Sequence, residues 1–131
     1  MRCMNASKSR PSWWLLWAPA IGMMVAIFAF SSVPSNDMPA FGLADFLVKK
    51  GGHMLGYALL SLSYQHALSR NRSYSSWFAW FFAVLFAISD EIHQIFVPGR
   101  GPLISDVGID ALGAGLSLML SALLWHPSNG E

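Results

Sequence analysis

Long runs of apolar residues without charge constrain this chain more than any other feature. Residues 13–30 form a run of 18 residues without a charge, which as a helix is about 27 Å long and matches the hydrocarbon core of a bilayer. Residues 75–97 and 104–125 are two further runs that are mainly apolar. Only 11% of all residues are charged, whereas soluble domains carry about a quarter. The sequence therefore predicts an all-α integral membrane protein.

Four transmembrane helices are expected to form one bundle in a single domain of residues 1–131. Their expected bounds are residues 13–32, 44–68, 75–97 and 104–125. The second is the least apolar, and Pro98 is expected to stop the third. Alternation with period two and internal repeats are both absent from the sequence, which excludes a β-barrel and a repeat architecture.

Both termini are predicted to lie in the cytoplasm of a cell whose plasma or inner membrane holds the protein. The distribution of basic residues supports this orientation, because Lys and Arg are more frequent in cytoplasmic loops. Five would lie inside, namely Arg2, Lys8, Arg10, Arg70 and Arg72, against Lys49, Lys50 and Arg100 outside. The same orientation places all six tryptophans at the cytoplasmic interface. A cleaved signal peptide is the alternative for the first run, but 18 residues favour a span.

Polar residues are expected to converge at the outer end of the bundle, from one face of the second helix, the outer thirds of the third and fourth helices and the turn between these two. They are Lys50, His53, Tyr57, Glu91, Gln94, Arg100, Asp106 and Asp110. A charge in hydrocarbon costs about 2.5–3.5 kcal/mol unless it is paired or solvated, so these side chains should face one another. The cytoplasmic halves are expected to lack polar residues, which favours a one-sided site over a path through the membrane.

These residues resemble the VanZ-like family, membrane proteins associated with resistance to the glycopeptide teicoplanin. The matching elements are Phe30-Ser31-Ser32-x-Pro34, Lys50-x-x-His53-x-x-x-Tyr57, Asp90-Glu91-x-His93-Gln94-x-Phe96-Val97-Pro98-Gly99-Arg100 and Asp106-x-x-x-Asp110-x-x-Gly113. The resemblance covers residues 15–125. Family members usually have Asp where this chain has Lys49, and Asn where it has Asp110. The resemblance implies an envelope membrane protein that modulates susceptibility to glycopeptides.

Two interpretations of the polar set stay open. The set is either an ion-pair network that fixes the helix register, or a binding site for a lipid head group or a lipid-linked envelope precursor. In the second case Lys50 and Arg100 would hold phosphate or carboxylate, and His53, Glu91 and Gln94 would supply polar contacts. The expected partners are therefore membrane lipids and such a precursor. Nucleic acid is excluded, because the net charge is only +1 and no basic run exists.

Two other functions remain alternatives, and the sequence decides neither catalysis nor oligomeric state. An intramembrane enzyme would use His53, Glu91 or Asp110 as catalytic residues, with Ser31 or Ser32 as a nucleophile activated by His53. A small proton-coupled transporter with four helices would need a dimer.

No metal or cofactor is expected. His53, Glu91 and His93 could be zinc ligands by type, but Glu91 and His93 project from different sides of one helix. Cys3 is the only cysteine, which excludes a disulfide within the chain.

Overall fold

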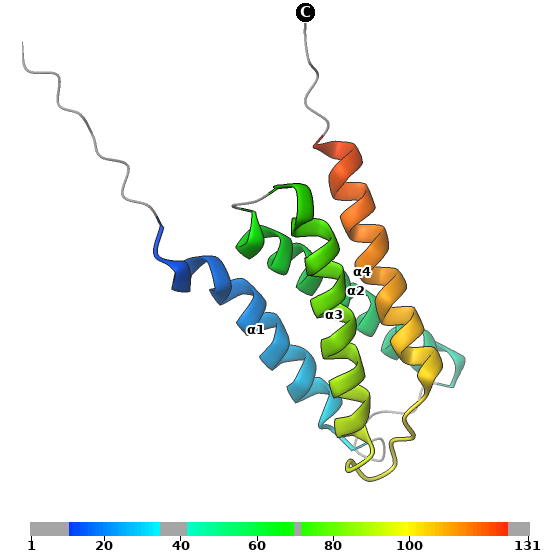
Figure 1. The fold of residues 1–131 in the computed structure, drawn as a ribbon. Coiled ribbons are helices and arrows are strands. Elements are labelled where there is room, and N and C mark those ends of the chain that lie inside the picture. Colours follow the sequence, from blue (N-terminus) through cyan, green and yellow to red (C-terminus); the bar gives the residue numbers. More distant parts are fainter. Residues whose placement is uncertain (1–10, 35–41, 70–71, 126–131) are drawn as a thin grey trace, which may run out of the picture.

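The structure is a computed structural model that describes residues 11–34, 42–69 and 72–125, without the side chains of residues 72–74. Four helices make up this part: α1 (Trp13–Ser31), α2 (Leu43–Leu68), α3 (Arg72–Gln94) and α4 (Ile104–Leu124), as Figure 1 shows. No strand occurs within the described ranges. The all-α prediction is confirmed.

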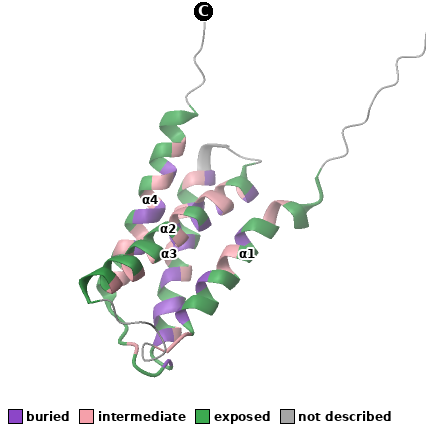
Figure 2. Ribbon diagram, turned by 180° about the vertical axis from the view of Figure 1, so that it is seen from behind, coloured by how far each residue is buried: buried purple, intermediate pink, exposed green. Residues whose placement is uncertain are grey.

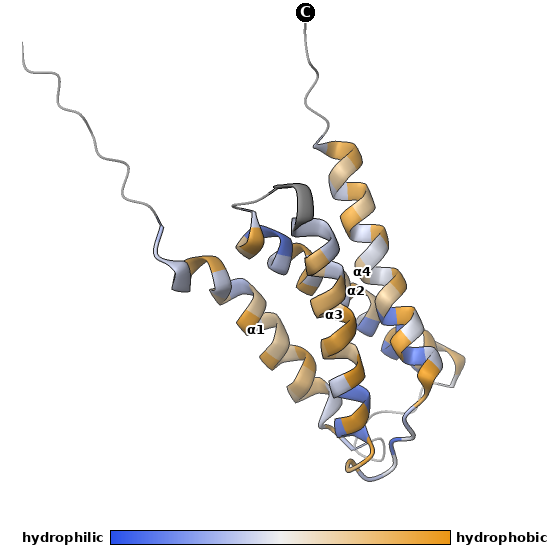
Figure 3. Cartoon of the chain, in the orientation of Figure 1, coloured by the Kyte–Doolittle hydropathy of each residue, from blue (hydrophilic) through white to orange (hydrophobic). Residues whose placement is uncertain are grey.

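Three helices are long and apolar enough to cross a membrane, in the segments Trp13–Ser31, Ser75–Gln94 and Ile104–Leu124. Apolar residues dominate these helices in Figure 3, and many of their large apolar side chains are exposed, as expected of surfaces that lipid covers. α2 differs because polar residues run along most of its length, from Asp45 to His66.

α2, which has no apolar stretch of span length, lies inside the bundle. It packs against all three other helices, whereas α1 and α4 do not contact each other within the described ranges. The buried residues in Figure 2 lie where the helices face one another. Tyr57 and Leu60 of α2 are fully buried, and Ala79, Ala83 and Ala87 form a buried stripe on α3. Small residues spaced by four allow helices to approach closely, so α3 can cover α2.

α2 and α4 run parallel, and Gly113 of α4 lies directly against Met54 of α2. A Cβ atom added there would lie 2.6 Å from the carbonyl oxygen of Met54 and 2.8 Å from its Cγ. The first of these atoms belongs to the backbone of α2 and cannot move alone. Glycine is therefore required at position 113 for the observed distance between the helices.

A row of polar pairs follows the contact between α2 and α4, and we call it the polar seam. The pairs are Lys50 with Asp106, Ser61 with Ser117, and Gln65 with Ser121, each separated by 56 positions in the sequence. The constant offset shows that the two helices stay in one register. The two serine hydroxyls lie 2.9 Å apart, and Ser121 donates to the Gln65 carbonyl oxygen at 3.1 Å.

The expectation that the halves predicted to be cytoplasmic lack polar residues is wrong, because the polar seam continues along α2 and α4 away from Lys50, through Ser61–Ser117 to Gln65–Ser121. Serine is short, and its hydroxyl can donate to a carbonyl of its own helix, as Ser61 does to Ala58 at 2.9 Å. Such residues interrupt an apolar run only weakly, so hydropathy does not reveal them.

α3 and the tryptophans differ in detail from the sequence prediction. α3 ends at Gln94 rather than residue 97, since Phe96 and Val97 donate to carbonyls three residues earlier, which tightens the chain into a turn. Trp80 packs inside the bundle, where its indole N–H donates to the Ala111 carbonyl at 3.0 Å. It therefore does not belong to an interfacial belt.

The orientation stays a prediction. Arg2, Lys8, Arg10 and Arg70, on which it rests, lie outside the described residues, as does the side chain of Arg72. Cys3 also lies outside them.

Substitution Gly113→Ala should separate α2 from α4 and lower the free energy of unfolding in detergent by about 1–3 kcal/mol, as overpacking does. Gly108→Ala is the matched control on α4, because nothing lies within 4 Å of an added Cβ. It should leave stability unchanged or raise it by about 1 kcal/mol. Equal stability of the two variants would contradict the close contact.

Candidate functional site

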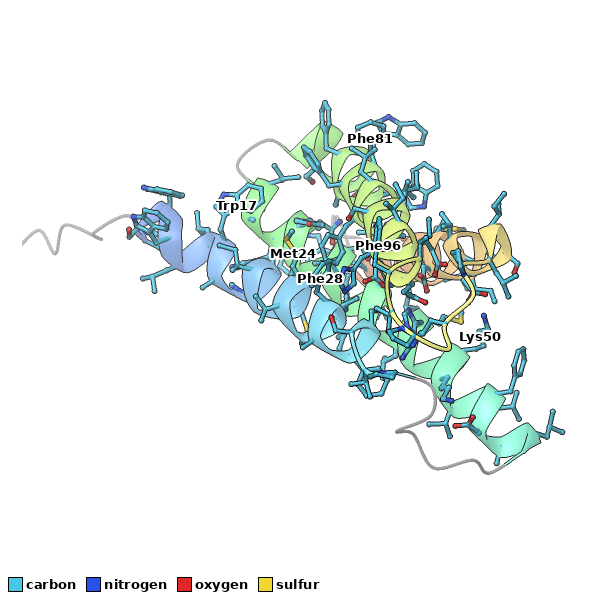
Figure 4. The ribbon with its side chains drawn as sticks, turned by 90° about the horizontal axis from the view of Figure 1, so that it is seen from below. Trp17, Met24, Phe28, Lys50, Phe81 and Phe96 are labelled. Carbon is cyan, nitrogen blue, oxygen red and sulfur yellow. The ribbon has the colours of Figure 1, made fainter. Side chains whose placement is uncertain are left out.

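The eight polar residues predicted to converge do lie together, at the end of the bundle where α1 and α3 end and α4 begins. We call this the polar end; its hydrophilic residues gather at the bottom of Figure 3. Figure 4 looks onto it and shows Lys50 on α2, near the start of α4. The bundle thus brings together side chains from α2, α3, α4 and the α3–α4 loop, while their role in binding stays a prediction.

Lys50 is held by an ion pair with Asp106 across the α2–α4 contact. Its ammonium nitrogen also lies 5.7 Å from the centre of the Phe46 ring, a distance at which a cation is attracted to an aromatic face. One turn further along, His53 Nδ1 lies 3.8 Å from Asp110 Oδ2. This is too long for a hydrogen bond, so the second pair is looser than the first.

Asp90 ties α1 to α3. Its Oδ2 accepts a hydrogen bond from the Ser31 hydroxyl at 2.7 Å and another from Gln94 Nε2 at 3.3 Å. Ser31 is 0% exposed and Asp90 1% exposed. Neither belongs to the predicted binding set, although both stand in the motifs that carry the family resemblance. Their pairing across 59 positions depends on the packing of α1, which the sequence pattern does not give.

Arg100 and Glu91 fasten the α3–α4 loop to the bundle. Arg100 donates from Nε to the Val33 carbonyl and from a terminal nitrogen to the Phe30 carbonyl, both at 3.2 Å. It thereby binds two carbonyls at and just beyond the end of α1, where helical hydrogen bonds run out. Glu91 Oε2 accepts the Leu103 N–H at 3.1 Å, just before α4 begins. Arg100 and Glu91 therefore fix the position of the α3–α4 loop relative to the end of α1 and the start of α4.

Four side chains at the polar end, three of them buried and one partly buried, carry buried atoms that the protein leaves unsatisfied; we call them the unpaired cluster. The residues are His53, Tyr57, Asp90 and Asp110. The atoms without a hydrogen-bond partner among the described residues are His53 Nδ1, the Tyr57 hydroxyl, Asp90 Oδ1 and both carboxylate oxygens of Asp110. Tyr57 and Asp110 each lie within electrostatic range of Asp90. Most buried polar groups are hydrogen-bonded, so this concentration of unsatisfied atoms is unusual.

An apolar groove between α1 and α2 reaches the unpaired cluster. Its volume is about 210 Å³. Its lining consists of Met23, Ala26, Ile27 and Phe30 from α1 and Gly52, His53 and Gly56 from α2. His53 is the only polar side chain in the lining, so it links the hydrocarbon surroundings of the bundle to Asp110 behind it.

The geometry disfavours a serine nucleophile activated by His53. The Ser31 hydroxyl donates a hydrogen bond to Asp90, and the Ser32 hydroxyl donates one to the Phe28 carbonyl at 2.7 Å. The histidine near Ser32 is His93, with Nε2 2.9 Å from the hydroxyl oxygen. The tautomer of His93 decides which of these two atoms donates. Neither serine has a hydrogen bond to His53 among the described residues, so the proposed pairing of a serine nucleophile with His53 as its base is not formed.

No group of three or more His, Cys, Asp or Glu side chains in the described part of the chain is placed to hold a metal ion. His93 hydrogen-bonds Ser32 and stacks on Phe28 with ring centroids 4.0 Å apart. His53 instead faces Asp110. The combination of His53, Glu91 and His93 weighed for zinc therefore does not form a common site.

A comparison with protein-family models matches residues 16–125 to VanZ/LLP1. The chain belongs to the VanZ/LLP1 family. The match covers most of the sequence and includes α1 from its first turn, the whole of α2 and α3, and α4. Comparisons with curated proteins and with solved structures gave no match. The residues of the VanZ/LLP1 resemblance are those that build the polar end, and with three helices able to span a bilayer they make this a membrane protein.

Removing the Asp90 carboxylate should loosen α1 from α3. Asp90→Ala leaves Ser31 and Gln94 buried without their shared acceptor and is expected to cost about 1–3 kcal/mol of unfolding free energy in detergent. Asp90→Asn should cost less, because its amide oxygen can still accept both hydrogen bonds. An equal loss in the two variants would show that the charge of Asp90, rather than its hydrogen bonds, holds α1. Ser89→Ala, at the exposed neighbouring position, is the control.

Proposed function

We propose that all four helices of this VanZ/LLP1 protein cross the inner membrane, with both termini in the cytoplasm and the polar end facing outward. The path of the chain supports four spans. α1 ends at the polar end and α3 begins at the opposite end, so α2 must run the full distance between them. Its 26 residues extend about 39 Å, enough to cross a bilayer while the other helices cover its polar residues.

The polar end, in this proposal, binds the polar part of an envelope lipid or lipid-linked precursor and thereby lowers susceptibility to glycopeptides such as teicoplanin. The observation that carries the proposal is the unpaired cluster beside the α1–α2 groove. Each unsatisfied buried polar group costs about 1–3 kcal/mol. A ligand that enters from the lipid phase and supplies the missing hydrogen bonds would offset that cost.

In this proposal, the polar residues divide between the two interpretations that the sequence leaves open. One group makes contacts that hold helices or loops in place, as an ion-pair network would; it consists of Lys50, Glu91, Arg100 and Asp106. His53, Tyr57 and Asp110 have unsatisfied atoms and are available to a ligand. The expectation that Lys50 and Arg100 hold an anion stays a prediction, since both already contact acceptors of the protein.

Replacing His53 by alanine should abolish the effect on glycopeptide susceptibility. Expressed in a teicoplanin-susceptible bacterium, the wild-type protein is expected to raise the inhibitory concentration, and His53→Ala to return it to the level of the empty vector at equal membrane abundance. His66→Ala is the matched control, because His66 is exposed at the other end of α2. An unchanged phenotype in His53→Ala, or none with the wild type, would contradict the proposal.

A second candidate, a proton-coupled carrier, is favoured by the polar seam. The seam leads from the polar end to a cavity of about 470 Å³ at the opposite end. Gln65, Ser76 and Ser121 line this cavity and hydrogen-bond one another, Gln65 Nε2 donating to Ser76 at 2.7 Å and Ser121 to Gln65. Polar groups thus occur at both ends of the α2–α4 contact, as a path through the membrane requires.

Proton movement along the seam is measurable in vesicles that hold a pH-sensitive dye. If the carrier function is correct, vesicles with the protein should acidify faster than empty ones after a pH step, and the double variant Ser61→Ala, Ser117→Ala should abolish the difference. Ser63→Ala is the control, since in the described part of the chain Ser63 donates to the Leu59 carbonyl of its own helix. Equal rates with and without the wild-type protein would exclude this candidate.

A further inference from the structure

We infer that the unpaired cluster binds a primary ammonium group, such as that of an aminolipid whose chain lies in the α1–α2 groove. The inference rests on the proposed function and names the chemistry of its ligand. Two independent observations carry it: the kind of atom left unsatisfied and the charge balance at the polar end.

The unsatisfied atoms of the cluster call for a hydrogen-bond donor. Three of the five are carboxylate oxygens, one from Asp90 and two from Asp110, and an ionised carboxylate only accepts hydrogen bonds. The Tyr57 hydroxyl, fully buried, can accept as well, and so can one nitrogen of a neutral His53. A primary ammonium offers three N–H donors from one small group. A phosphate dianion offers none, so it would leave these oxygens unsatisfied.

The charge balance also favours a cation. The described residues of the polar end include four carboxylates, Asp90, Glu91, Asp106 and Asp110, against the cations Lys50 and Arg100 and against His53, which faces Asp110 and adds a third positive charge only when it is protonated. Lys50 is paired with Asp106. An anionic ligand would add negative charge to a buried, already acidic site, which is costly where water is excluded. An ammonium placed between Asp90 and Asp110 would reduce that excess.

The route of entry points to an amine joined to an apolar chain. Asp90, Asp110 and Tyr57 are no more than 1% exposed, whereas the His53 side chain is 14% exposed and lines the α1–α2 groove. Gly52 and Gly56 have no side chains; Ile27 of α1 packs against Gly56, whereas nothing lies within 4 Å of a Cβ added at Gly52, so the groove is open beside Gly52. An acyl chain can therefore lie against α1 and α2 while the polar group passes His53.

Lipid retention in native mass spectrometry tests the inference with a matched pair of probes. Phosphatidylethanolamine and phosphatidylcholine with the same acyl chains differ only in whether the nitrogen carries three hydrogens or three methyl groups. The full chain, released from phosphatidylglycerol nanodiscs that contain equal amounts of both, should retain phosphatidylethanolamine at least about tenfold more often. One hydrogen bond to a charged group is worth about 1.5–3 kcal/mol, and each 1.4 kcal/mol is tenfold.

Two nearly isosteric variants should remove this preference. Asp110→Asn deletes the charge and one acceptor, and Tyr57→Phe deletes only the hydroxyl, so Tyr57→Phe decides the result if Asp110→Asn does not fold. Each should reduce the preference about tenfold. Asp45→Asn is the control, because Asp45 pairs with Lys49 on the first turns of α2, away from the cluster.

Soluble amines distinguish a free ligand from a lipid. Methylammonium could stabilise the wild-type protein against heat while tetramethylammonium does not, with no preference between the two lipids. That result would support ammonium binding by the cluster and show that the ligand is a soluble amine. Equal retention of the two lipids together with no effect of methylammonium would overturn the inference. In that case a teicoplanin phenotype that depends on His53 would still uphold the proposed function. A lipid preference without the phenotype would contradict the proposed function and support ammonium binding by the unpaired cluster.

Discussion

The burial of a polar helix among apolar ones is the constraint on which this structure depends. α2 carries too many polar side chains to face hydrocarbon, and it packs against every other helix of the bundle. Its parallel contact with α4 is tight enough to require Gly113, and one offset of 56 positions pairs polar residues from Lys50 to Gln65. Since each unpaired charge in hydrocarbon costs several kcal/mol, the register of these two helices determines where every other polar group can lie.

The polar end combines two kinds of ionisable residue that the sequence does not separate. One kind builds the fold: Arg100 holds carbonyls at the end of α1, and Glu91 holds the start of α4. The other kind, represented by Asp110 and Tyr57, is buried without hydrogen-bond partners in the described structure. The structural contacts keep the unsatisfied groups close together, and rigid placement of this kind is what a binding site for a small polar group needs. The apolar groove at His53 gives that site access to the lipid phase.

The sequence predicts the order of the helices and the gathering of polar residues at one end, because apolar runs of span length and short connections leave few other arrangements. It does not predict the bonds between Ser31 and Asp90 or between Ser32 and His93, which depend on how α1 rotates against α3. Nor does it predict the serines of the polar seam, since their hydroxyls bond within the helices and barely change hydropathy. The family resemblance marks most of the residues of the polar end but not their division into structural and unsatisfied groups.

The central claim, that a donor from the membrane completes the unpaired cluster, is tested most directly by solid-state NMR. Protein with ¹³C-labelled aspartate carboxyls would be placed in a bilayer whose ethanolamine lipid carries ¹⁵N in its head group. A dipolar coupling at hydrogen-bonding range is expected between that nitrogen and the carboxyls of Asp90 and Asp110, and the coupling to Asp90 should weaken in Asp110→Asn. The absence of any coupling at the aspartates, or a coupling to Asp90 that persists unchanged in the variant, would contradict the claim.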